Sequence, residues 1–246
     1  MRVEGARIGW LLSLCPSAGE GGGSFRYATQ PVRRHHLGPA KEPERSAAEA
    51  ARRARSKTRR YCAANRLNRL GTLTYRDEGC HDPQALRTHV ADFFRALRKL
   101  LGGKPFPYLW TAEWHKSGHG LHVHFAVGQY IGRRLIEQAW PHGFVHIKLL
   151  GDLPVGSGTY AEARRAAGYL SKYVGKDFDA ERLPGLHRYE LAQGFQPETV
   201  PLWGRSMPDV IAQASKVMGE APATVWTSDQ TEGWQGPPAV WVSWRG

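Results

Sequence analysis

Cysteine is scarce in this chain. Three residues, Cys15, Cys62 and Cys80, are spread over 246 positions, and no two of them form a C-x-x-C pair. An odd, widely spaced set indicates neither a disulfide framework nor a structural zinc knuckle. Long apolar runs are missing too: the N-terminal one is too short for a secretory signal, and no later stretch approaches the roughly 18 apolar residues of a membrane span. These absences predict a cytoplasmic protein with no membrane partner.

Acidic residues are also in short supply. The chain has 22 Asp and Glu against 34 Lys and Arg, a formal net charge of +12, and residues 33–69 alone hold 12 basic and 3 acidic side chains. A localised excess of this kind suits a polyanion, of which nucleic acid is the commonest, although a solvated basic helix that binds nothing shows the same pattern. The candidate DNA-binding residues are Arg52, Arg53, Arg55, Lys57, Arg59, Arg60, Arg66 and Arg69.

Composition divides the chain into four segments. Residues 1–43 are irregular, with three consecutive glycines and several prolines, and we expect them to be mostly disordered. Residues 44–70 are rich in Ala, Arg and Glu without an interior Pro or Gly, which predicts a basic helix. Residues 71–180 carry the motifs described below and form the expected core, and residues 181–246 form a C-terminal extension of unassigned role.

The core shows a mixed order of strand and helix patterns. The expected elements are a strand at 72–75, a helix at 82–101, strands at 107–115 and 120–128, a helix at 132–140, a strand at 144–150 and a helix at 160–177. Weaker signals follow for strands at 188–191, near 225 and at 240–244, and for a helix at 208–218. This order predicts an α+β fold in which helices pack on a central antiparallel sheet.

The two central strands form a predicted hairpin with polar residues on one face. If Ser117-Gly118 is the turn, Glu113 lies opposite His122, with Cβ atoms about 4.5 to 5.5 Å apart, and His124 shares their face. Two imidazoles and one carboxylate leave coordination positions open, as a catalytic metal requires. For a phosphodiester substrate, the expected ion is Mg²⁺ or Mn²⁺. The alternative is that both histidines are ordinary surface or hydrogen-bonded side chains.

A second polar pattern lies on the predicted helix at 160–177. Tyr169, Lys172, Tyr173 and Lys176 stand at i, i+3, i+4 and i+7 and share one helix face. A phenol with a pKa of about 10 becomes a nucleophile when cations stabilise its oxyanion, and lysines also offset charge on a reacting phosphate. A tyrosine packing pair with lysines that favour the helix dipole explains the same spacing without chemistry.

Taken in order, these motifs resemble the HUH endonuclease superfamily, named for a triplet that corresponds here to His122-Val123-His124. More narrowly, the chain resembles rolling-circle replication initiators of small plasmids and single-stranded DNA phages. Thr72-Leu73-Thr74-Tyr75 matches their first motif, Glu113 with the triplet their second, and residues 169–176 their third. The arginine-rich run with residues 186–190 is similar to initiators from actinobacterial plasmids.

The resemblance implies a fold, a reaction and partners. It implies a ferredoxin-like nuclease core in which Glu113, His122 and His124 bind the metal. Tyr169 and Tyr173, with Lys172 and Lys176 as companions, would then nick and rejoin single-stranded or hairpin origin DNA through a 5′-phosphotyrosine. No Gly-rich phosphate loop is present, so unwinding is expected from a host helicase and synthesis from a host polymerase.

Two other functions remain open at this point. A transposase or mobilisation nuclease of the same superfamily needs only one tyrosine. A non-catalytic nucleic-acid-binding protein would use the histidines and tyrosines to contact bases and would bind no metal. The pattern also leaves open which tyrosine attacks first.

Overall fold

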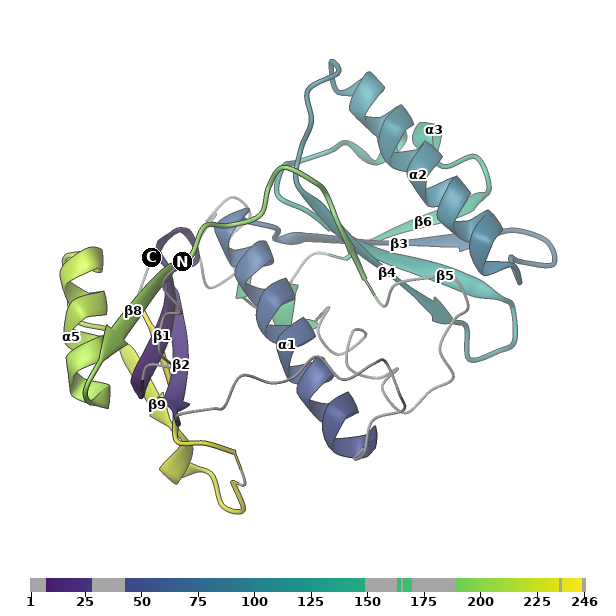
Figure 1. The fold of residues 1–246 in the computed structure, drawn as a ribbon. Helices are drawn as coiled ribbons and strands as arrows, with labels where there is room; N and C mark the ends of the chain where they lie inside the picture. Colours follow the sequence, from purple (N-terminus) through teal and green to yellow (C-terminus); the bar gives the residue numbers. More distant parts are fainter. Residues whose placement is uncertain are drawn as a thin grey trace, which may run out of the picture. The chain divides into compact units, whose positions relative to one another are not determined.

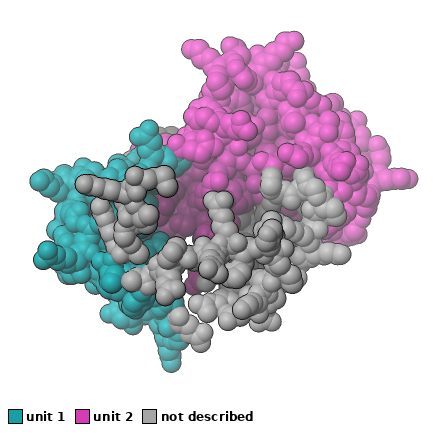
Figure 2. Space-filling view, viewed as in Figure 1, with its two compact units in different colours: residues 1–43, 197–246 teal, residues 44–196 magenta. Residues whose placement is uncertain are grey.

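The computed structural model describes residues 8–27, 43–148, 163–164, 166–169, 189–234 and 236–244. The chain divides into two compact units, residues 44–196 and the combination of residues 1–43 with 197–246 (Figure 2). Each unit contains one five-stranded antiparallel sheet. The fold class is therefore α+β, as predicted, and the larger unit is consistent with a ferredoxin-like core.

The sheet of the larger unit has the strand order β6-β3-β5-β4-β7 (Figure 1). Its strands are β3 (Arg69–Tyr75), β4 (Tyr108–Trp114), β5 (Leu121–Val127), β6 (Gly143–Lys148) and β7 (Glu190–Leu191). In the hairpin of β4 and β5, β5 is the central strand of the sheet, and β3 pairs with its other edge. Side chains on these strands alternate between two faces, so each face has its own partners.

One face of this sheet packs against α2 (Pro83–Leu100) and α3 (Arg133–Ala139) (Figure 1). The helix α2 begins where predicted, because the Asp82 carboxylate accepts a hydrogen bond from Gln84 N at 2.8 Å and Pro83 occupies the first turn. Its buried side chains recur at helical spacing and pack on Val123 and Phe125 of β5: they are Leu86, Val90, Phe93, Phe94 and Leu97.

The opposite face packs against α1 (Pro43–Ala64) and a helical segment whose described residues are 163–164 and 166–169. Tyr61 and Cys62 of α1 join Ala166 and Ala167 over an apolar patch of the sheet, formed by Leu70, Leu109 and Ala126. The hydroxyl of Tyr61 also donates to Ala192 O at 3.2 Å. The basic helix and the segment that leads into the predicted tyrosine motif therefore lie on the same side of the sheet.

The helix α1 ends at Ala64, whereas the sequence predicted a helix to residue 70. Arg66 has a φ of 54°, the left-handed conformation that closes many helices, and Leu67 N donates to Cys62 O at 2.9 Å. The side-chain amide of Asn65 donates to Tyr61 O and to Phe195 O, both at 2.9 Å. Because an arginine replaces the usual glycine at this cap, the local pattern gave no stop signal.

The smaller unit combines the two ends of the chain. Its sheet has the order β8-β1-β2-β10-β9. The strands are β1 (Gly9–Cys15), β2 (Glu20–Arg26), β8 (Val200–Gly204), β9 (Thr224–Thr227) and β10 (Ala239–Ser243), and α5 (Met207–Met218) packs on one face. Short 3-10 turns occur at Pro16–Ala18 and Ser228–Gln230. Among the residues that the structure describes, no helix has both the length and the apolar character to cross a bilayer.

The expectation of disorder over residues 1–43 is wrong for residues 9–26, which form β1 and β2. The glycines of β2 permit close strand contact: a Cβ on Gly23 would lie 2.3 Å from Leu11 O, and one on Gly21 would lie 2.9 Å from a Leu12 methyl carbon. The other partner of β2 is β10, more than 200 residues later, where Val240 pairs with Gly23. Residues 1–7 and 28–42 lie outside the described part of the chain.

Candidate metal centre

The hairpin of β4 and β5 has the predicted register. Glu113 pairs with His122, and Trp114 pairs with Leu121. The connecting loop closes with a hydrogen bond from His115 N to Gly120 O at 2.8 Å. Gly118 has a φ of 81°, a conformation that glycine adopts without steric cost.

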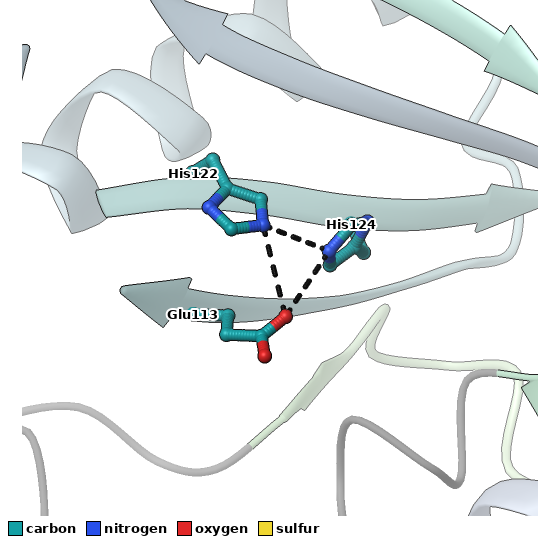
Figure 3. A group of neighbouring side chains, drawn as sticks. All are labelled: Glu113, His122 and His124. Atoms are coloured by element: carbon teal, nitrogen blue, oxygen red, sulfur yellow. Dashed lines mark hydrogen bonds and ion pairs between the residues drawn. The ribbon is translucent and has the colours of Figure 1, made fainter. Parts of the chain in front are cut away.

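Glu113, His122 and His124 converge on one point above the sheet (Figure 3). The Oε2 of Glu113 lies 3.7 Å from His122 Nε2 and 3.5 Å from His124 Nε2. The two Nε2 atoms lie 3.0 Å apart, and one ligand atom from each residue falls within 4.8 Å of the others. The prediction that these three side chains share one face and meet is confirmed.

The local environment favours a neutral His122. Burial of its ring, together with the nearby His115 imidazole, lowers the pKa of His122 to about 4. The rings of His115 and His122 have centroids 5.4 Å apart. Since metal binding requires the unprotonated imidazole, His122 is in its ligating form at neutral pH.

Thr72 of β3 sets the orientation of His124. Its Oγ1 lies 3.0 Å from His124 Nδ1, and the two residues are direct partners in the sheet. With the proton on Nδ1 donated to the hydroxyl, His124 Nε2 carries the lone pair that faces Glu113; we assign this tautomer from the contact. The sequence predicted Thr72 in a central strand without a role, although its place two residues before Thr74 already indicated an outward polar face.

This donor set can hold a metal ion. Two neutral imidazoles and one carboxylate provide nitrogen and oxygen ligands on a rigid two-stranded platform, and a third strand orients one ring. Mixed ligands of this type accept several divalent ions, so they do not specify which ion binds.

The tyrosine motif is only partly within the described residues. Tyr169 lies in the helical segment at 166–169, is half-buried, and packs against the apolar cluster that contains Leu109 and Ala126. Ala126 is two residues from His124 along β5, so the two side chains share a face, and Tyr169 packs on the face that carries the metal-ligand triad. Lys172, Tyr173 and Lys176 lie outside the described residues.

Most of the predicted DNA-binding residues lie on α1, which covers the triad's face of the sheet. Exposed and half-buried side chains both occur: Arg52, Arg53, Arg55 and Lys57 are exposed, and Arg59, Arg60, Arg66 and Arg69 are half-buried. Arg69 is held by the protein, since its guanidinium donates to Asn68 Oδ1 at 2.8 Å and lies 6.0 Å from the Tyr130 ring. DNA contact by these residues stays a prediction.

Residues 68–178 match the sequence model of a family of replication-associated proteins of the ORF2 type. The matched region begins one residue before β3, includes the triad and reaches past Tyr169, and it covers less than half of the chain. The match supports a role as a replication initiator. No curated protein and no solved structure matches the chain.

Proposed function

We propose that this protein is a rolling-circle replication initiator that nicks and rejoins single-stranded origin DNA through a 5′-phosphotyrosine. The observation that carries the proposal is the convergence of Glu113, His122 and His124 on the sheet face against which Tyr169 packs. The match of residues 68–178 to a replication-associated family supports the same role.

The three ligands have distinct tasks in this proposal. Glu113 supplies negative charge, and the neutral His122 and the Thr72-oriented His124 supply nitrogen lone pairs. Together they would hold Mg²⁺ or Mn²⁺. Such an ion, when bound, acts as a Lewis acid on a non-bridging oxygen of the scissile phosphate.

The tyrosine hydroxyl would supply the nucleophile. The phenolic oxygen of Tyr169 or Tyr173 attacks phosphorus, the bond from phosphorus to the 3′-oxygen breaks, and the leaving oxygen takes up a proton as a free 3′-hydroxyl. The 5′-phosphate stays on the tyrosine, so the bond energy is retained for rejoining. Lys172 and Lys176 would stabilise the phenolate and the charge that develops on the phosphate.

The basic face of α1 would hold the DNA strand. Arginines on the same side of the sheet as the triad can neutralise phosphates without reading sequence. A single-stranded or hairpin origin is the proposed substrate, and host helicase and polymerase would supply unwinding and synthesis.

The test uses labelled single-stranded oligonucleotides that tile the DNA flanking the coding sequence, incubated with the full chain and Mn²⁺. We expect a protein–DNA adduct that survives a denaturing gel, is lost in EDTA, and is absent from the double variant Tyr169→Phe, Tyr173→Phe. Adduct formation by that double variant would contradict the assignment of nucleophiles. Adduct formation by His124→Ala in the same metal would contradict the assigned ligands.

A further inference from the structure

A groove lies on the face of the larger unit's sheet opposite to the metal-ligand triad. It has a volume of about 560 Å³ and lies between α2 and the strands β4 and β7. Tyr108 of β4 lines it, and because strand side chains alternate, Tyr108 points away from the face that carries Glu113. The groove therefore belongs to neither the triad nor the basic face of α1, and a volume of this size accommodates a small organic group.

Arginines from one stripe of α2 line the groove. Arg87, Arg95 and Arg98 lie on its wall, and the side chains of Arg87 and Arg95 are 57% and 74% exposed. Asp92 pairs with Arg95, so Arg87 and Arg98 are the principal cations. Arg98 donates through Nε to Gly103 O at 2.6 Å, which fixes the direction of the side chain and leaves its terminal nitrogens for a ligand.

The floor of the groove is aromatic. The rings of Phe94 and Tyr108 stack with centroids 3.6 Å apart and planes inclined by 7°. Phe106 lies edge-on to Tyr108 at 5.9 Å, and the half-buried Phe195 completes the wall. Phe94 and Phe106 are buried in the core, so Tyr108 is a rigidly supported ring at the groove surface. Fixed aromatic rings beside cations are the combination on which nucleic acid bases stack while arginines contact phosphates.

One carboxylate oxygen in the groove lacks a donor. Glu190 of β7 is the sheet partner of Trp110, so it faces the α2 side. Its Oε1 is buried and, among the described residues, accepts no hydrogen bond; the nearest arginine nitrogen, Arg87 Nη2, is 4.0 Å away. A buried acceptor of this kind is satisfied by a ligand N–H, and the exocyclic amine of cytosine is a donor that glutamate recognises.

We propose that this groove is a second, non-catalytic binding site for single-stranded DNA. Backbone phosphates contact Arg87 and Arg98, one base stacks at Tyr108, and its amino group donates to Glu190. The proposal rests on the proposed function only for its partner, single-stranded DNA, and does not require cleavage. A strand held there is anchored on the side of the sheet remote from the triad, so the site adds affinity for DNA that flanks the nick.

The experiment measures fluorescence anisotropy of labelled oligodeoxycytidine and oligodeoxythymidine with the full chain in EDTA, so that no cleavage occurs. Arg98→Ala is compared with Arg134→Ala, which removes an exposed arginine of α3 outside the groove. We expect Arg98→Ala to reduce the slope of log affinity against log salt by about 1 relative to Arg134→Ala, because one phosphate contact is lost. Arg98→Glu should weaken binding further. Equal affinities and slopes for Arg98→Ala and Arg134→Ala would overturn the proposal.

Glu190→Met provides an independent readout. We expect the native chain to prefer oligodeoxycytidine over oligodeoxythymidine by about tenfold, the value of one good base contact. The variant should lose that preference, although removal of a negative charge strengthens its general affinity for phosphate. A preference that survives Glu190→Met would contradict the assigned base contact.

The outcome is separable from that of the proposed nuclease function. Arg98→Ala should still form the covalent adduct with an oligonucleotide that spans only the nick site, because the groove is not part of the cleavage site. Groove binding without any adduct would reject the nuclease and keep the groove. Adduct formation with no effect of Arg98→Ala on binding would do the reverse.

Discussion

Thr72 Oγ1 lies 3.0 Å from His124 Nδ1, and this contact joins β3 to β5 directly beside the metal-ligand triad. The contact gives a threonine of the first motif a positioning role for a ligand of the second. It also explains why the triad needs a three-stranded platform, since the hairpin alone would leave the His124 ring free to rotate about its own bonds.

We expect Thr72→Val to weaken Mn²⁺ binding by about tenfold while the chain stays folded, because valine keeps the volume and removes the oxygen that orients His124. Isothermal titration calorimetry measures the affinity. Thr74→Val is the matched control: Thr74 lies on the same strand face, and its hydroxyl donates to Phe144 O at 3.4 Å, away from the triad. Equal Mn²⁺ affinity in the two variants would show that Thr72 does not position the ligand.

Removal of a ligand should abolish the stabilisation that a metal confers. At a metal concentration of about 100 times Kd, binding stabilises the native chain by about 2.7 kcal/mol, seen as a rise in melting temperature. His124→Ala should lose this rise. His146→Ala should keep it, because His146 is an exposed histidine on β6 that pairs with the other side of Thr72. A metal-induced rise of the same size in both variants would place the ion elsewhere.

The stability of the unliganded chain should depend on pH through His142. Burial, the His89 ring stacked at 3.9 Å and the Arg76 cation lower the pKa of His142, and Asp92 only partly opposes them. The unfolded chain therefore binds the proton more readily, so the free energy of unfolding falls as pH drops below about 6.5, the ordinary histidine pKa. Urea unfolding in EDTA at a series of pH values should show a shallower fall for His142→Gln than for the native chain. Parallel curves would exclude this contribution.

Gly71 of β3 should not tolerate a side chain. A Cβ at this position would lie 2.3 Å from ring carbons of Phe125, its partner on β5, which is fully packed in the core. We expect Gly71→Ala to lower the free energy of unfolding by about 1–3 kcal/mol through overpacking. Gly132→Ala is the control, because nothing lies within 4 Å of a Cβ there. Because Gly71 precedes Thr72, the shift of Phe125 should also lower Mn²⁺ affinity, whereas an unchanged affinity would mean that the strain stays on the α2 face.

Local patterns were sufficient for the elements that position the triad. The Ser117-Gly118 turn and the alternation along β5 predicted that Glu113 faces His122, and the structure has that pairing. The apolar spacing of α2 and its Asp82-Pro83 start were equally clear in the sequence. The boundary of α1 was not, because its end depends on Asn65 reaching Phe195, a contact across 130 residues.

The amino-acid sequence by itself determined the chemistry of this protein: which side chains can ligate, which can attack, and which strand face they share, because turn geometry and a period of two act over a few residues. Only the tertiary structure decided that residues 9–26 form strands, since β2 is ordered by β10 from the far end of the chain. It alone created the groove of Arg98, Tyr108 and Glu190, because these residues come from one helix and two strands that lie far apart in the sequence. Contacts of that separation depend on packing, which leaves no period in the sequence to read.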